Sequence, residues 1–203
     1  QSKVNFIADG FDDNRNNWDL YDTKDYRFQI ADGHLAIDAY SVAVHAFQNI
    51  NATKEDSYAI HTRMIFLNGT SEGWMGIRFN MSEDATRYLT FSFNNAQGFL
   101  VSNHAGKKHE VLRESKSVVI KPYDYNTLTV VKKENKYQFL INDKQVYQDE
   151  LKSFYGSQAG IYVSNNMSVK TDEFQVYDLR RGKQKIISSQ VAMAKASDTD
   201  IKQ

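Results

Sequence analysis

Two neighbouring segments of the sequence carry side chains that could hold a polar ligand. Residues 72–80 and 87–94 each alternate apolar and polar positions with the period of two that is typical of β-strands. The apolar positions predict one buried face for each strand. The opposite positions carry Trp74, Arg78, Tyr88, Ser92 and Asn94. Tryptophan, tyrosine and arginine together are unusual on a merely solvated face, and they are typical of a surface that holds a sugar or another polar, planar ligand.

Two further predicted strands add cationic and imidazole side chains to this set. His45 lies opposite the apolar positions of residues 42–46, and His61 and Arg63 lie opposite those of residues 58–66. The predicted ligand-binding residues are Trp74, Tyr88, Arg63, Arg78, His61 and Asn94. The alternative is that a loop or the C-terminal segment covers Trp74 and Tyr88, which then form a second, smaller core.

Catalytic motifs are absent from the sequence. Hydrolysis of a glycosidic bond on a sheet takes two carboxylates on one face, which strands supply as Glu-x-Asp or Glu-x-x-x-Glu. Adjacent acidic residues such as Asp172 and Glu173 should point to opposite faces of a strand, and Asp172 shares the core-side parity of Phe174. We therefore predict no catalytic residue, although a pair of carboxylates from separate strands stays open.

Metal-binding motifs are also weak. The five histidines show neither H-x-H nor H-E-x-x-H spacing, and the chain has no cysteine, so zinc ligation has no support. Asp12, Asn14 and Asn16 alternate like the first half of a calcium loop, but Asn17 stands where such a loop has glycine and Thr23 stands where it has glutamate. Asx turns explain this segment more simply. We predict no cofactor, with calcium as the open alternative.

Composition limits the partners. The 203 residues suit one large domain, and 25 basic residues balance 25 acidic ones, which argues against nucleic acid or an anionic membrane surface and favours a neutral partner such as a saccharide or polysaccharide. No apolar run is long enough to span a membrane. Twelve tyrosines, twelve phenylalanines and a single proline suit β-strands. Without cysteine, the fold must be held by packing and hydrogen bonds alone.

The pattern along the chain is that of an all-β protein. Asp32-Gly33 between alternating segments predicts a two-residue hairpin, and residues 128–147 predict a three-stranded meander. Residues 103–108 suggest a turn, and no helix is expected before residue 180. The predicted domain is 1–179, followed by a basic, then polar tail over 180–203. Apolar residues at helical spacing in this tail predict a short helix on the sandwich, and a linker is the alternative.

The second half of the chain resembles a known superfamily through several short motifs. These are N-x-L-x-V at Asn126, Y-x-F-x-I-N at Tyr137, F-Y-G-x-x-x-G-I-x-V at Phe154 and D-x-F-x-V at Asp172. They resemble the concanavalin A-like lectin/glucanase superfamily in its laminin-G-like form, and especially the secreted bacterial 3-keto-disaccharide hydrolase-like domains. The resemblance covers roughly residues 5–179 and specifies the fold better than the activity.

The resemblance implies a two-sheet, antiparallel jelly-roll sandwich of about 12 to 15 strands that binds saccharide on one sheet face or at its rim. The first functional hypothesis is a secreted, non-catalytic carbohydrate-binding or recognition module. The second is a glycoside hydrolase of the 3-keto-disaccharide hydrolase-like kind, and the third is a protein-interaction or sensor module of a larger assembly. Because the chain begins at Gln1, we expect a removed signal peptide and a secreted, periplasmic or cell-surface location in a bacterium.

Overall fold

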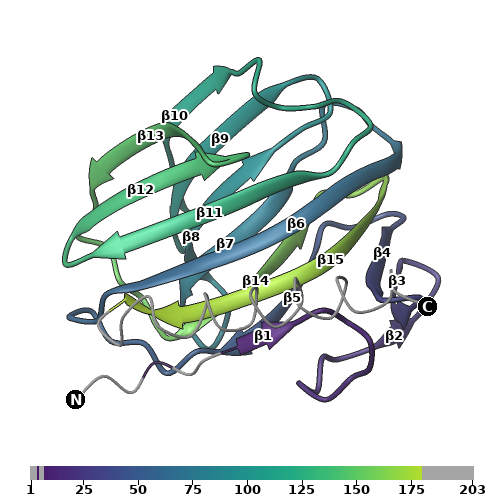
Figure 1. Ribbon diagram of the computed structural model, residues 1–203, viewed down its shortest axis with the longest axis horizontal. Helices are drawn as coiled ribbons and strands as arrows, with labels where there is room; N and C mark the ends of the chain where they lie inside the picture. Colours follow the sequence, from purple (N-terminus) through teal and green to yellow (C-terminus); the bar gives the residue numbers. More distant parts are fainter. Residues whose placement is uncertain (1–3, 5–6, 180–203) are drawn as a thin grey trace, which may run out of the picture.

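The computed structural model describes residue 4 and residues 7–179 of the chain. This part contains fifteen β-strands arranged in two antiparallel sheets that pack face to face (Figure 1). The predicted all-β sandwich and the predicted number of strands are confirmed. The C-terminal tail, with its predicted short helix, lies outside the described residues. No helix in the described part of the chain has the length and apolar character needed to cross a membrane.

One sheet contains nine strands and lies in front in Figure 1. Its strands are, in spatial order, β13 (Lys144–Glu150), β12 (Lys136–Ile141), β11 (Asn126–Lys133), β6 (Tyr58–Gly69), β15 (Met167–Asp178), β4 (His34–Ala39), β3 (Tyr26–Ala31) and β2 (Tyr21–Asp22), with β1 (Ile7–Asp9) also paired to β15. The two long strands β6 and β15 are neighbours at its centre. They bring segments about a hundred residues apart in the sequence into register, such as Gln175 opposite His61.

The other sheet contains six strands. They are, in spatial order, β10 (Lys108–Lys116), β9 (Gly98–Ala105), β8 (Arg87–Phe93), β7 (Met75–Met81), β14 (Gln158–Val163) and β5 (Val44–Asn49). The segments that the sequence analysis paired, β7 and β8, are neighbours at the centre of this sheet, with Ile77 opposite Phe91. Strand β14 lies on the other side of β7, so β7 pairs with β8 along one edge and with β14 along the other.

The apolar faces of the two sheets form one core between them. The predicted inward positions of β7 and β8 are all at most 1% exposed, and these are Met75, Ile77, Phe79, Leu89, Phe91 and Phe93. Aromatic rings join the sheets across the core, since the Phe91 ring lies 5.1 Å from the ring of Phe139 on β12. Alternation of period two therefore identified the buried face correctly.

Tight turns connect many of the strands, as the sequence predicts. Asp32 and Gly33 join β3 to β4 with φ angles of 52° and 69°, which is the left-handed geometry that a two-residue type I′ hairpin needs. Asn142 and Asp143 join β12 to β13 in the same way, with φ angles of 49° and 61°. The predicted hairpin at Asp32-Gly33 and the predicted three-stranded meander are confirmed.

Residues 103–108 are a place where the prediction was wrong. Strand β9 continues to Ala105 and β10 begins at Lys108, so the turn is only two residues long and uses Gly106 at a φ of 66°. Strand β10 was missed because it forms the edge of its sheet, where most of its side chains are exposed and charged. Charged residues protect an edge strand from pairing with other chains, and they also remove the apolar alternation.

Candidate functional site

The outward face of the six-stranded sheet carries an arginine held between two tyrosines. Arg78 lies on β7, Tyr162 on the neighbouring β14 and Tyr88 on the neighbouring β8. The guanidinium carbon of Arg78 is 3.9 Å from the centroid of the Tyr162 ring and 4.2 Å from that of Tyr88. Cation–π contacts of this kind fix the position of the charge without neutralising it. We call this surface, with His45 and His104 beside it, the arginine–tyrosine face.

His45 on β5 extends the face on one side. Its Nδ1 lies 3.2 Å from Nη1 of Arg78. Because an arginine only donates, Nδ1 of His45 accepts this hydrogen bond and the ring is neutral. Burial, and secondly the charge of Arg78, lowers the pKa of His45 to about 4. The Arg78 charge is therefore not shared with a cationic histidine at neutral pH.

A stack of rings extends the face on the other side. The Tyr88 ring lies 4.5 Å from that of His104, which lies 4.2 Å from that of His109. Burial, then the nearby His109 and Arg78, lowers the pKa of His104 to about 4. The rings contact one another across neighbouring strands, so a ligand on this face meets their edges, including the phenol hydroxyls and ring nitrogens.

Beneath these side chains lies a floor of small polar residues with unused hydrogen-bonding groups. Thr90 lies opposite Arg78 on one side and Ser102 on the other, in one row across the sheet. The hydroxyl oxygens of Thr90, Ser92 and Ser102 are buried and have no hydrogen-bond partner among the described residues. Most buried polar groups in proteins are paired, and an unpaired one costs about 1–3 kcal/mol. These hydroxyls lie beneath the covering side chains as donors and acceptors that the described part of the protein leaves unused.

The two depressed histidine pKa values predict a loss of stability in mild acid. The unfolded chain binds protons at His45 and His104 below about pH 6.5, whereas the folded protein binds them only near pH 4, so stability falls as the pH drops through this window. For His45 alone we expect the free energy of unfolding to fall by about 2–3 kcal/mol. Thermal melts at pH 7 and pH 4.5 measure this loss. His45→Gln, which keeps an acceptor for Arg78, should lose clearly less; an equal loss in this variant would contradict the assignment.

The structure brings together only part of the predicted binding set. Arg78 and Tyr88 lie on the arginine–tyrosine face. Arg63 and His61 do not, because β6 belongs to the nine-stranded sheet. The expectation that all these side chains share one face is therefore wrong, and His45 and His61 are on different sheets. Alternation shows which side of a strand faces outward, but not which of two sheets the strand joins.

Trp74 and Asn94 lie at the ends of strands of the six-stranded sheet. Trp74 precedes β7 and is partly exposed. Its backbone N–H donates to Oγ of Ser164, and its carbonyl accepts from the backbone N–H of Ser164. Asn94 follows β8 and is buried, and its side-chain oxygen accepts a 2.7 Å hydrogen bond from the backbone N–H of Gly98. The Asn94 side chain therefore holds the turn between β8 and β9.

Tyr162 and His104 complete the arginine–tyrosine face and were not among the predicted residues. Tyr162 alternates with Ile161 and Val163, which are fully buried, so its outward direction could be inferred from the sequence. Its place beside Arg78 could not, because that depends on β14 pairing with β7 across eighty residues of sequence. His104 was assigned to a turn that is in fact the end of β9.

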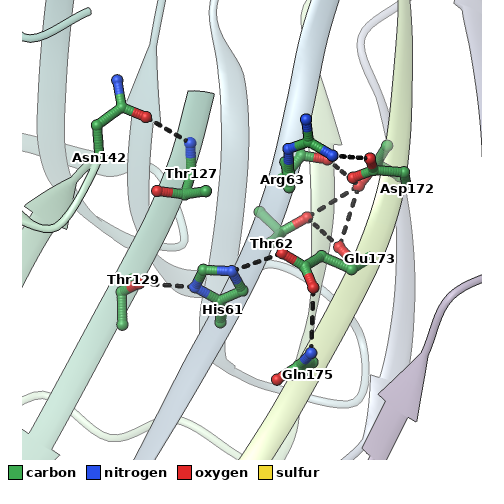
Figure 2. Close-up of polar contacts among 10 residues, drawn as sticks. His61, Thr62, Arg63, Thr127, Thr129, Asn142, Asp172, Glu173 and Gln175 are labelled. Atoms are coloured by element: carbon green, nitrogen blue, oxygen red, sulfur yellow. Dashed lines mark hydrogen bonds and ion pairs between the residues drawn. The ribbon is translucent and has the colours of Figure 1, made fainter. Parts of the chain in front are cut away.

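A second polar cluster lies on the outward face of the nine-stranded sheet (Figure 2). A β-bulge in β15 inserts Asp172 between Thr171, which pairs with Met64, and Glu173, which pairs with Arg63. After the extra residue, the side chains that face the core are even-numbered instead of odd-numbered. As a result Asp172 and Glu173 are both partly exposed while Thr171 and Phe174 are buried. The predictions that Asp172 faces the core and that the two carboxylates point to opposite faces are wrong.

We call Asp172 and Glu173, with their partners Arg63 and His61, the carboxylate cluster. Each carboxylate in it has its own basic partner. Nε2 of His61 lies 2.8 Å from Oε1 of Glu173, and Arg63 donates a hydrogen bond to Asp172 while its guanidinium covers the ring of Tyr125 at 4.1 Å. The hydrogen bond from His61 holds the pKa of Glu173 below its usual value, whereas burial raises the pKa of Asp172. Two adjacent carboxyl groups are thus biased toward different protonation states.

The calcium-like segment uses its side chains within the protein. Asn14 accepts a 2.8 Å hydrogen bond from the backbone N–H of Trp18 and donates one of 3.0 Å to the Trp18 carbonyl. Asn16 donates a 2.7 Å hydrogen bond to the carboxylate of Asp9. This is the local turn chemistry expected of asparagine. Within residues 7–179, no three histidine or acidic side chains converge as a metal site requires.

Comparisons with known proteins relate this chain to others through its fold alone. No protein-family profile matches the chain, and no curated protein is detectably similar in sequence. Among solved structures, the carbohydrate-binding module CBM66 from Bacillus subtilis is 13% identical with a TM-score of 0.56, and the match covers 88% of this chain and 99% of that one.

Two other solved structures match over nearly their whole length. An endo-β-1,3-glucanase from Pyrococcus furiosus is 11% identical with a TM-score of 0.63, covering 87% of this chain and 95% of that one. A Bacillus subtilis protein of unknown function with a galectin-like fold is 12% identical with a TM-score of 0.64, covering 88% and 97%. Together with the two stacked antiparallel sheets, these matches show that the chain has a concanavalin A-like jelly-roll fold.

Proposed function

We propose that this protein is a secreted, non-catalytic carbohydrate-binding module that holds a saccharide on its arginine–tyrosine face. The observation that carries the proposal is the combination, on one face, of aromatic rings around Arg78 and a floor of hydroxyls without partners among the described residues. Sugar hydroxyls bind to polar groups such as the guanidinium, the phenol hydroxyls and the ring nitrogens of this face. The carbohydrate-binding module among the structural neighbours supports the proposal, as does the balanced charge of the chain.

A glycan-binding screen with wild type and two tyrosine variants tests this proposal. Tyr162→Ala removes a ring that covers Arg78 and should weaken binding by at least about tenfold, or about 1.4 kcal/mol. Tyr40→Ala is the control, because Tyr40 is 48% exposed and follows β4 of the other sheet. Thermal melts confirm that each variant is folded. Wild type that binds no glycan, or a folded Tyr162→Ala variant with unchanged affinity, would contradict the proposal.

A glycoside hydrolase is the second candidate, because of the carboxylate cluster. Hydrolysis needs one protonated and one ionised carboxyl group near the bond, and the environments of Asp172 and Glu173 push their pKa values in those two directions. The same glycan panel, with 3-keto-disaccharides added, can be assayed for released reducing sugar. Turnover that Glu173→Gln abolishes would move this candidate ahead of the binding module, and wild type without turnover would set it aside.

A further inference from the structure

We propose that the saccharide bound on the arginine–tyrosine face carries a carboxylate, as a uronic acid does, and that Arg78 is its receptor. This inference rests on the proposed function and names the class of its ligand. The charge of Arg78 lies between the rings of Tyr88 and Tyr162 and has no acidic partner in the described part of the chain.

Other arginines on the sheets show what a structural arginine looks like in this protein. Arg27 on β3 contacts Asp38 on β4 at 2.7 Å, and Arg63 on β6 pairs with Asp172 on β15. Both are more than 40% exposed at the side chain, and each still has its carboxylate. In Arg78 the Nε atom is shielded from solvent, and the neighbours of the side chain are tyrosines and a neutral histidine. A buried charge without a counter-ion is costly, so its retention needs a reason.

The electrostatic surroundings of Arg78 support this contrast. Burial is the largest influence on the pKa of Arg78 and lowers it, and the hydroxyls of Tyr88 and Tyr162 partly offset this. No carboxylate of the described residues contributes to the balance. An incoming carboxylate would therefore meet a desolvated cation with no protein acid competing for it, which is the setting in which an ion pair is strong.

The geometry of the Arg78 guanidinium suits a carboxylate. A guanidinium has five N–H donors in one plane, and His45 accepts from Nη1 while Nε has no partner among the described residues. The rings of Tyr88 and Tyr162, from the strands on either side, cover the guanidinium and leave its edge as the direction of approach. A planar carboxylate matches that edge with two parallel hydrogen bonds.

Isothermal titration calorimetry with paired ligands tests the inference. The probes are oligogalacturonate, oligomannuronate and oligoglucuronate, each as the free acid and as its methyl ester, which keeps the sugar and removes the charge. Wild type should bind at least one acid more than about tenfold tighter than its ester. Arg78→Gln should lose that preference. Arg113→Gln, which removes the same charge from an exposed position on β10 of this sheet, should keep it.

The outcomes separate this inference from the proposed function. Equal affinity of wild type for acid and ester, or binding of a sulfated galactan oligosaccharide and of no uronate, would overturn the carboxylate assignment. Neutral glycans that bind wild type and Arg78→Gln equally, and that Tyr162→Ala fails to bind, would overturn it too while the binding-module proposal stands. A wild type that binds no glycan of any charge would remove both. The ester comparison uses wild type alone, so it holds even if Arg78→Gln does not fold.

Discussion

Replacing Asp9 with alanine is expected to lower the free energy of unfolding by about 3–5 kcal/mol. Asp9 is 5% exposed, and its carboxylate accepts hydrogen bonds from the indole Nε1 of Trp18 at 2.6 Å, the backbone N–H of Phe11 at 2.8 Å and the amide of Asn16 at 2.7 Å. Alanine would leave these three donors without their acceptor, and the donors of Phe11 and Trp18 are buried away from water. Each orphaned donor costs roughly 1–3 kcal/mol.

The effect should be large because this carboxylate fixes the loop that closes one end of the core. The Trp18 ring is 2% exposed and packs edge-on against Phe174 of β15 at 5.3 Å. Urea unfolding followed by tryptophan fluorescence measures the loss. Asp13→Ala is the matched control, since Asp13 lies in the same loop and contacts only the exposed Arg15 in the described structure, so the free energy of unfolding should stay close to that of wild type. An Asp9→Ala variant within 1 kcal/mol of wild type would contradict this role.

Most of the fold could be predicted from the sequence because the protein buries one face of nearly every strand. Burial of a single face forces alternation of period two, as at Ile77 and Phe79 on β7, and left-handed turns need residues such as Asp32 and Gly33. These signals are local, so one sequence is enough to detect them. Strand β10 escaped because an exposed edge strand has no face that must be apolar.

The candidate site was less predictable because it depends on which strands become neighbours. The outward direction of Arg78 and Tyr88 was predicted from alternation, and so was that of Arg63. That Arg78 meets Tyr162, whereas Arg63 meets Asp172, follows from strand pairing over long separations in the chain. Register of this kind is set by the packing of the whole sandwich, not by any short motif.

The β-bulge at Asp172 shows a further limit of alternation. One inserted residue reversed the expected direction of Asp172 while leaving Phe174 in the core, so the strand changes parity in the middle of an otherwise regular pattern. The sequence signal for the bulge was the adjacent pair Asp172-Glu173 itself, since a carboxylate on the core side of a strand is costly. Alternation placed a charged side chain at a position that should be apolar, and this conflict marked the site of the bulge.

Replacing Gly160 with alanine is expected to lower the free energy of unfolding by about 3 kcal/mol or more and to abolish glycan binding. A Cβ at Gly160 on β14 would lie 1.9 Å from the carbonyl oxygen of Ala46 and 2.5 Å from the Cα of Phe47, both backbone atoms of β5. Neither atom can turn aside, so β5 must move away from β14 and take His45 away from Arg78.

Thermal melts and the glycan screen together measure this effect. Gly10→Ala is the control, because its added methyl group would meet only the carboxylate of Asp12 at 3.9 Å and should leave both stability and binding unchanged. Two results would contradict the argument: a Gly160→Ala variant that melts like wild type, which would mean that β14 and β5 are not this close, or one that is destabilised yet binds glycan as wild type does. The second would show that the saccharide does not need the β5 side of the face, since His45 reaches Arg78 only through this pairing.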